Sequence, residues 1–195
     1  MKIVGIGGGS GSGKSTLAHG LKENFPAINL IHLDDYQKKK KDTPIYNGFR
    51  NRDHPDSINF ERLICDLEKL RSGQKVHSMT WRMHLDQNDT VDDKVPYVVY
   101  PSSIIVLEGY MTLLKEEIRN HLDYSVFLDL DFATRISRRN KSNPGDYLTK
   151  VLLPMHELYV EPTKVYAMIT IDVNGKSKEE VLEEVVSGLC EGGML

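Results

Sequence analysis

Glycine near the N-terminus is the feature that most constrains how this chain can fold. Six of its 15 glycines lie within residues 5–13, in the stretch KIVGIGGGSGSGKST. Ordering glycine costs more conformational entropy than ordering any other residue, and glycine has no side chain to pack. A chain that gathers glycines between an apolar run and a helix-like run therefore needs bare backbone there. The stretch predicts a tight turn that joins a buried strand to a helix.

The same stretch satisfies the pattern G-x-x-x-x-G-K-[ST] between Gly8 and Ser15. In that pattern the backbone N–H groups of the turn, together with the N-terminus of the following helix, bind phosphate oxygens. Lys14 can reach the β- and γ-phosphates of a nucleotide, and the Ser15 hydroxyl can bind Mg²⁺. A glycine-rich turn without a ligand is the alternative. The predicted nucleotide-binding residues are Gly8, Gly9, Ser10, Gly11, Ser12, Gly13, Lys14, Ser15 and Thr16.

Apolar runs alternate with helix-period segments along the rest of the chain. The runs at 28–33, 102–109 and 124–131 are almost continuously apolar, as in parallel strands covered on both faces. Alternation of strands and helices favours right-handed crossovers. We therefore expect an α/β fold of three layers, a parallel sheet with helices on both faces. The other expected elements are strands at 2–6 and near 166–173, and helices from 14, from 60 and around 112–120, 132–140, 146–160 and 178–190.

Two segments interrupt this alternation. Residues 74–100 contain two strand-like pieces, KVHSMTWRM and VPYVVY, around a polar DQNDTVDD, which predicts a small antiparallel β-flap on the substrate side. Residues 140–146, NKSNPGD, predict a short lid. A chain of 195 residues fits one sizeable domain, so we expect a single domain over 1–195 with these two additions.

Composition excludes several classes of protein. A net charge of −3 and a pI near 6.2 give no general attraction to nucleic acid or anionic membranes, and the apolar runs are too short to span a bilayer. Cys65 and Cys190 lack metal-ligand spacing and indicate reduced thiols in a cytoplasmic protein. We expect neither a nucleic-acid nor a membrane partner, and the oligomeric state stays open. Residues 38–41, KKKK, are interpreted as a solvated loop, with a phosphate-facing role as the alternative.

Acidic residues follow two of the predicted strands. IIVLEG ends in Glu108, whose carboxylate could bind Mg²⁺ beside Ser15, or could cap a following helix instead. LIHLDDYQK brings Asp34 and Asp35 to the same edge of the sheet as the glycine turn. A carboxylate there could accept the proton of an attacking hydroxyl. Asp34 is our candidate for the base and for a further metal ligand, and two solvated turn residues are the alternative.

These motifs resemble the uridine kinase-like branch of the P-loop kinases, whose members include nicotinamide riboside kinases, phosphoribulokinases and bacterial pantothenate kinases. The resemblance spans most of the chain. It rests on six motifs in order, GGGSGSGKST, LDDYQK, DHPDSINFERL, IIVLEGY, FLDLDFATRISRR and EPTKVYA. It implies a P-loop NTPase fold, ATP and Mg²⁺ as cofactors, and a small-molecule acceptor with a free hydroxyl.

The resemblance also implies roles for single residues. Asp34 matches the catalytic base, and Asp53 matches a carboxylate that accepts from two ribose hydroxyls of the acceptor. His54 either assists Asp53 or serves the entry to the next helix. Arg139 matches an arginine that binds the acceptor and takes part in catalysis.

Arg135 and Arg138 share a helical face with that arginine and are expected to face the ATP phosphates, with a solvated basic face as the alternative. Trp81 is expected to be an aromatic platform for the acceptor, or else part of the flap core. Tyr36 is expected to line the same pocket.

Three departures from the family pattern bear on the substrate. MTWR replaces the Pro-x-Tyr-Asp of uridine and cytidine kinases, the lid is shortened, and Tyr36-Gln37 replaces two aromatics. We therefore expect an ATP-dependent phosphotransferase acting on a hydroxyl of a nucleoside-like or sugar-like molecule. A nicotinamide riboside kinase-like or other non-pyrimidine acceptor is the alternative. Further alternatives are a nucleotide-binding switch, although no guanine-selecting Asn-Lys-x-Asp is present, and a regulatory relative without transfer activity.

Overall fold

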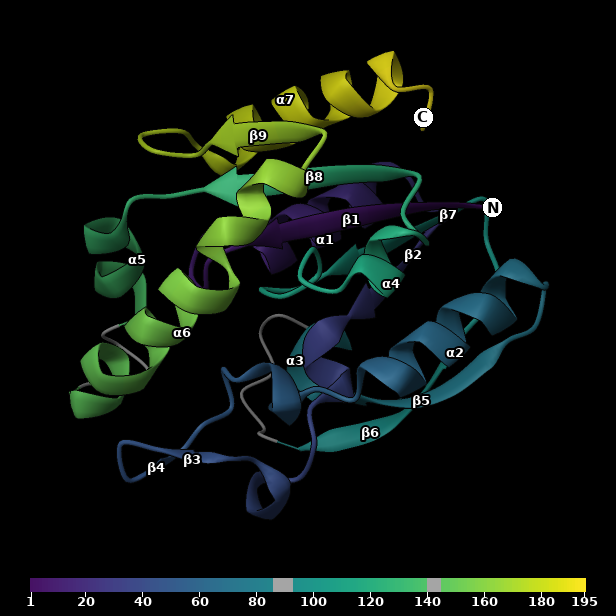
Figure 1. The fold of residues 1–195 in the computed structure, drawn as a ribbon. Coiled ribbons are helices and arrows are strands. Elements are labelled where there is room, and N and C mark those ends of the chain that lie inside the picture. Colours follow the sequence, from purple (N-terminus) through teal and green to yellow (C-terminus); the bar gives the residue numbers. More distant parts are fainter. Residues whose placement is uncertain (86–92, 140–144) are drawn as a thin grey trace.

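The computed structural model describes residues 1–85, 93–139 and 145–195. Its centre is a five-stranded sheet in the order β2-β7-β1-β8-β9 (Figure 1). Every neighbouring pair in this sheet is parallel, as the alternation of strands and helices predicts. The strands are β1 (Lys2–Gly8), β2 (Ile28–His32), β7 (Ile104–Glu108), β8 (Tyr124–Asp129) and β9 (Ile169–Asp172).

Helices cover both faces of the sheet (Figure 1). Alternate residues of a strand point to opposite faces, so Ile3 and Ile105 join one buried cluster and Val4 and Val106 join the other. The first cluster is closed by α2 (Phe60–Arg71) and α4 (Glu116–Arg119), and the second by α1 (Lys14–Asn24) and α7 (Lys178–Glu191). The three-layer prediction is confirmed.

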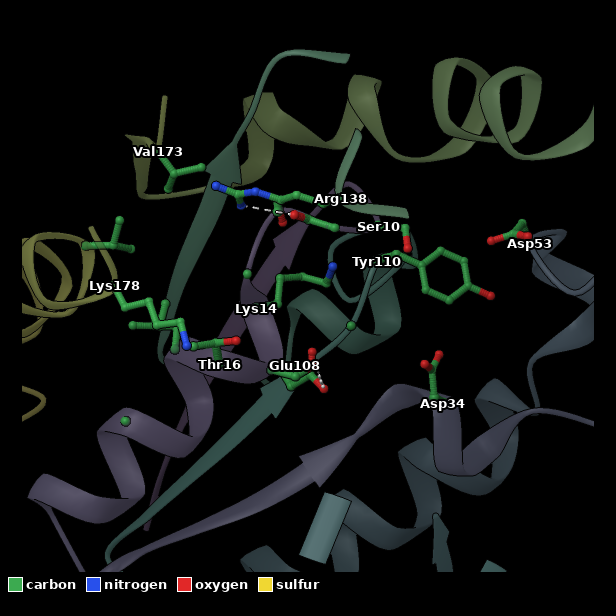
Figure 2. Close-up of a pocket in the computed structure, with 18 of the residues that line it drawn as sticks. Ser10, Lys14, Thr16, Asp34, Asp53, Glu108, Tyr110, Arg138, Val173 and Lys178 are labelled. Carbon is green, nitrogen blue, oxygen red and sulfur yellow. Dashed lines mark hydrogen bonds between the residues drawn. The ribbon is translucent and has the colours of Figure 1, made fainter. Parts of the chain in front are cut away.

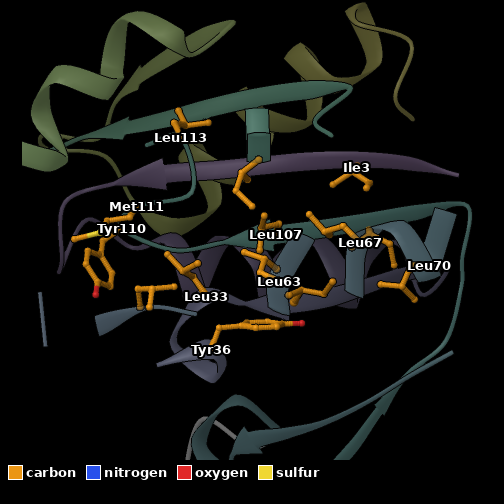
Figure 3. Close-up of a cluster of buried hydrophobic side chains, with 14 of the residues drawn as sticks. Ile3, Leu33, Tyr36, Leu63, Leu67, Leu70, Leu107, Tyr110, Met111 and Leu113 are labelled. Carbon is orange, nitrogen blue, oxygen red and sulfur yellow. The ribbon is translucent and has the colours of Figure 1, made fainter. Parts of the chain in front are cut away.

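Helix α2 shows how local sequence sets this packing. Its N-terminus is capped by the Asn59 side chain, which accepts from the Arg62 N–H at 3.0 Å. Leu63, Leu67 and Leu70 lie on one face and are fully buried in the first cluster (Figure 3). Burying a leucine contributes about 1.5–3 kcal/mol, so this stripe anchors the helix against the sheet.

One predicted helix is shorter than its pattern suggested, and another contains a π-helical turn. In 112–120 only α4 is α-helical, and Thr112 and Leu113 before it are fully buried. In 146–160 a π-helical turn (Leu148–Leu152) leads into α6 (Leu153–Tyr159). Helix α5 spans Phe132–Arg139. Of the predicted lid at 140–146, residues 140–144 lie outside the described part of the chain.

Two hairpins stand outside the sheet. The predicted flap contains β5 (Val76–Trp81) and β6 (Lys94–Val99), paired antiparallel, and the short α3 (Arg82–Leu85) follows β5; residues 86–92 lie outside the described part. The second hairpin, β3 (Ile45–Tyr46) and β4 (Phe49–Arg50), was not predicted. Its two-residue turn, Asn47-Gly48, has positive φ at both residues, which suits a right-twisted hairpin. Within the described ranges, no helix combines the length and apolar character needed to cross a bilayer.

Candidate active site

A cleft of about 1680 Å³ lies at the carboxyl-terminal edge of the parallel sheet. One side, which we call the loop half, is lined by residues 10–17 and by residues around the start of α7. The other side, which we call the hairpin half, is lined by Asp34, Gln37, Lys40, Gly48, Phe49, Arg50, Arg52, Asp53, Tyr110, Asp146 and Tyr147. Figure 2 shows Val173 and Lys178 at one side, Asp53 and Asp34 at the other, and Lys14 and Glu108 between them.

The glycine turn has the backbone that its sequence predicts. Gly8 has a φ of 136°, and a Cβ there would lie 2.5 Å from the Leu128 carbonyl oxygen. Gly13 caps α1 in the left-handed region, with a φ of 97°. Residues 10–16 all line the cleft. Because the first N–H groups of a helix have no intrahelical acceptor, this segment can donate to an anion.

Two cations lie at this turn. Lys14 is buried and donates to the Gly9 carbonyl at 2.9 Å, and its ammonium points into the cleft (Figure 2). Arg138, at the end of α5, donates to the Gly11 carbonyl at 3.2 Å and lines the cleft. The loop half thus combines backbone donors with two positive charges, an arrangement suited to a nucleotide triphosphate.

Arg135, expected to face the phosphates, instead lies behind the turn. Its side chain is 7% exposed, and neither it nor Gly8 nor Gly9 lines the cleft. A Cβ on Gly9 would come within 2.2 Å of the Arg135 Nη1, which shows that the guanidinium packs closely against the backbone at Gly9. Burial lowers the pKa of Arg135, opposed by the charges of Glu161, Asp129 and Asp131.

Glu108 lies between the two halves and has two partners. The Ser15 hydroxyl donates to its Oε1 at 3.1 Å, and the Nδ1 of His32 lies 2.7 Å from the same oxygen. The strand register explains the second contact, since His32 and Glu108 are opposite each other on β2 and β7. A carboxylate beside a hydroxyl offers the oxygen ligands that Mg²⁺ prefers, and the remaining ligands of such an ion are commonly phosphates and water.

His32 and Glu108 shift each other's pKa toward the charged form. Burial favours the neutral carboxyl, but the hydrogen bond and charge of His32, with Lys14 and His84, lower the pKa of Glu108 to about 2. Burial likewise opposes the charged imidazole, but Glu108 raises the pKa of His32 above its usual value. Sequence reasoning missed His32, although a lone histidine within an apolar strand two residues before Asp34 was a usable signal.

Asp34 follows β2 in a 3₁₀ turn (Leu33–Tyr36) and lines the cleft opposite Glu108. Burial raises the pKa of its carboxyl, and the charge of Glu108 adds to the effect, while His84 and Lys14 oppose it. A carboxylate with a raised pKa takes up a proton more readily near neutral pH, which suits a base.

The flap hairpin braces the turn that carries Asp34. The Trp81 indole donates to the Asp34 carbonyl at 3.3 Å, and Lys94 donates to the Asp35 carbonyl at 2.8 Å. The Asp35 carboxylate accepts from the Trp81 N–H at 3.2 Å and lies 3.1 Å from His84. Trp81 does not line the cleft, so it supports the Asp34 turn from outside.

Asp53 faces the hairpin half, where the Tyr147 hydroxyl donates to its Oδ2 at 2.6 Å. The Asp53 N–H in turn donates to the Asn51 side chain at 3.0 Å. Sequence reasoning found Asp53 through the family motif but missed Tyr147, Tyr110 and the β3–β4 residues. They come from segments far apart in the chain, and no local pattern links them.

The structure does not bring two further predicted residues to the cleft. Tyr36 is buried in the first cluster beneath Leu63, and its hydroxyl donates to Asp66 at 3.2 Å (Figure 3). His54 accepts from the Asp56 N–H at 3.1 Å and packs edge-on against Tyr159, which is the helix-entry alternative. Arg139 ends α5, but its side chain lies outside the described part of the structure.

The start of α7 forms the far wall of the loop half. The sequence predicted this helix but not its place at the cleft. Ser177 caps this helix and accepts from the Glu180 N–H at 3.1 Å, while the Glu180 side chain accepts from the Ser177 N–H at 2.7 Å. This capping box fixes Ser177 and Lys178 at the cleft beside Val173.

Comparison with known proteins adds independent findings. Residues 3–179 match the Phosphoribulokinase / Uridine kinase family. A uridine kinase of Chlamydia pneumoniae is 33% identical over 96% of this chain and 87% of its own length. A uridine kinase of Clostridium novyi is 32% identical over 90% of this chain and 89% of its own length.

Solved structures share the fold at lower identity. A possible uridine kinase from Bacillus stearothermophilus aligns with a TM-score of 0.62 at 20% identity, covering 88% of each chain. Shikimate kinase from Acinetobacter baumannii aligns with a TM-score of 0.59 at 14% identity, covering 98% of this chain and 94% of its own.

Proposed function

The chain belongs to the phosphoribulokinase and uridine kinase family and is an ATP-dependent small-molecule kinase; we propose that Asp34 is the base with which it passes the γ-phosphoryl group to an acceptor hydroxyl. The acceptor is nucleoside-like or sugar-like. The observation that carries this proposal is one cleft with a phosphate-binding turn on one side and two carboxylates, Asp34 and Asp53, on the other.

In this mechanism the loop half holds ATP. The N–H groups of residues 10–16 and the Lys14 ammonium bind the triphosphate, and Arg138 lies over the turn. Ser15 and Glu108 are the residues that would hold Mg²⁺, which neutralises phosphate charge when bound. Because the carboxylate of Glu108 stays ionised, it is available to a cation throughout the physiological pH range.

The hairpin half holds and activates the acceptor. Asp53 accepts hydrogen bonds from a vicinal diol, and Tyr147 fixes the orientation of its carboxylate. Asp34 accepts the proton of the attacking hydroxyl as the oxygen–phosphorus bond forms and the bond to ADP breaks. Most of the rate enhancement comes from this positioning, since phosphoryl transfer passes through a loose transition state. Arg139 is proposed to assist at the acceptor, and the β5–β6 hairpin to serve as the substrate-side flap.

An acceptor screen tests this function. Formation of ADP from MgATP is measured with uridine, cytidine, nicotinamide riboside and pantothenate, and GTP replaces ATP in a parallel series. We expect ADP formation that depends on one of the acceptors and on Mg²⁺. Turnover that no acceptor stimulates would overturn the proposal. A cytoplasmic location, predicted from the two cysteines, is tested by cell fractionation.

A further inference from the structure

The hairpin half carries three cationic side chains for which the proposed reaction has given no role. Lys40 belongs to a short 3₁₀ turn, Arg50 ends β4, and Arg52 follows two residues later; all three line the cleft. Among the residues that the structure describes, none of the three lies within 4.0 Å of a carboxylate oxygen.

Neutral groups hold the two arginines in place. Arg52 donates from Nε to the Gln37 side-chain oxygen at 3.0 Å, and its guanidinium lies 5.6 Å from the centre of the Trp81 ring. Arg50 donates from Nη1 to the carbonyls of Lys41 and Thr43, both at 3.0 Å. Such partners fix a guanidinium without cancelling its charge.

Two of the three carboxylates in this half have other partners, and the third, Asp34, is the proposed base. Asp53 accepts from Tyr147, and Asp146 pairs with Lys150 at 2.6 Å. The triphosphate does not account for the three cations either, because the loop half supplies its own, Lys14 and Arg138. Figure 2 shows Asp53, the neighbour of Arg52, on the opposite side of the cavity from Lys178. Among the residues that the structure describes, the three cations at this end of the cleft therefore make no ion pair.

Building on the function proposed above, we propose that the acceptor carries an anionic group, a carboxylate or a phosphate, in addition to its hydroxyl, and that Arg50 and Arg52 bind this group. A planar guanidinium matches the paired oxygens of either anion. Lys40 adds a third charge at the same end. All three cations are exposed at the cleft, and a neutral nucleoside would form no charge pair with them. The residues that select the acceptor thus lie on the unpredicted β3–β4 hairpin and the segment that follows it.

Pairs of acceptors, in each of which one member carries a carboxylate or phosphate that the other lacks, test this inference. The pairs are nicotinamide riboside with nicotinic acid riboside, uridine with its 6-carboxylate orotidine, and ribulose with ribulose 5-phosphate. Acceptor-dependent ADP formation gives kcat/KM, and calorimetry gives Kd. In the pair that holds the best acceptor, we expect the anionic member to be preferred at least about tenfold, as for a hydrogen bond to a charged group. The carboxylate and phosphate pairs identify which anion is bound.

A neutral best acceptor would overturn the inference while leaving the proposed kinase function intact. If no member of any pair binds or reacts, the proposed function fails with it. Arg52→Gln and Arg50→Gln should each lower the ratio of anionic to neutral kcat/KM about tenfold or more. Arg119→Gln is the matched control, because Arg119 also donates to two backbone carbonyls but lies outside the cleft. An unchanged ratio in both cleft variants would contradict the assignment.

Discussion

The two halves of the cleft are built in different ways. The backbone donors of the loop half come from one continuous stretch, residues 10–16, next to glycines with positive φ. The hairpin half is assembled from side chains as far apart in sequence as Asp34 and Tyr147. Backbone recognition of phosphate leaves a compact sequence motif, whereas side-chain recognition of an acceptor leaves scattered residues. Under the proposed function, nucleotide binding therefore depends on local sequence, and acceptor binding depends on the fold.

The largest effect is expected in the loop half. Lys14→Met removes the one side-chain charge that the motif places at the phosphates, so kcat/KM for ATP should fall about 10³-fold. Steady-state kinetics and calorimetry with ATP measure this loss. Lys22→Met is the control, since Lys22 also lies on α1 and donates to a backbone carbonyl at 3.2 Å outside the cleft. Activity of Lys14→Met within threefold of the wild type would refute a charge-based role.

The folding stability at low pH tests the role of Glu108, which lies between the two halves of the cleft. The pKa of Glu108 is about 2 in the folded chain against a usual 4.5, so its carboxylate stabilises the fold above pH 4.5 and the contribution disappears as pH falls toward 2. A shift from 4.5 to about 2, at about 1.4 kcal/mol per unit, corresponds to about 3 kcal/mol. The contribution of His32 to folding stability depends on pH in the opposite direction. Because its pKa is raised in the folded chain, the protonated imidazole stabilises the fold at low pH, and this stabilisation is lost as pH rises through the raised pKa.

Urea unfolding of the wild type and Glu108→Gln at several pH values measures the Glu108 contribution. The wild type should lose about 2 kcal/mol relative to the variant between about pH 5 and pH 3. Carboxyl groups remote from Glu108 titrate alike in both proteins and cancel in the difference, which then reports Glu108 together with Asp34 and His32, whose pKa values Glu108 raises. A difference that does not vary with pH would show that Glu108 is not held ionised by His32.

A substitution in the hairpin half should weaken binding of the acceptor and leave binding of ATP unchanged. Asp53→Asn removes a charged hydrogen-bond acceptor, so KM for the acceptor should rise roughly 10- to 100-fold while the Kd for ATP stays the same. Asp56→Asn, an exposed neighbour outside the cleft, is the control. An equal loss of ATP affinity would break the proposed division between the two halves.

The smallest effect is expected for the hydrogen bonds from the β5–β6 hairpin that support the turn carrying Asp34. Lys94→Met removes the donor to the Asp35 carbonyl, and the less rigid turn should lower kcat about two- to tenfold with KM for ATP unchanged. Lys75→Met, an exposed lysine just before β5, should have no effect on either constant. If the Lys94 variant instead changes KM for ATP, the flap acts on the loop half and the brace is misassigned.

Sequence reasoning predicted the fold, and the strand–turn–helix at its phosphate motif, because each depends on local pattern. Apolar runs defined the strands of the sheet, and Gly8 to Ser15 matched a single motif. The structure places Tyr36 and Arg135 away from the cleft, because the direction of a side chain depends on tertiary packing that no local pattern records. Short strands such as β3 and β4 carry too few residues for any periodicity to show.

The most direct test of the account is the turnover of Asp34→Asn with saturating MgATP and the best acceptor. If Asp34 takes the proton of the attacking hydroxyl, kcat should fall about 10²- to 10⁴-fold while ATP binding is retained, and Asp42→Asn, exposed on a neighbouring turn, should keep wild-type kcat. An Asp34→Asn variant that phosphorylates the acceptor at the wild-type rate would contradict the account.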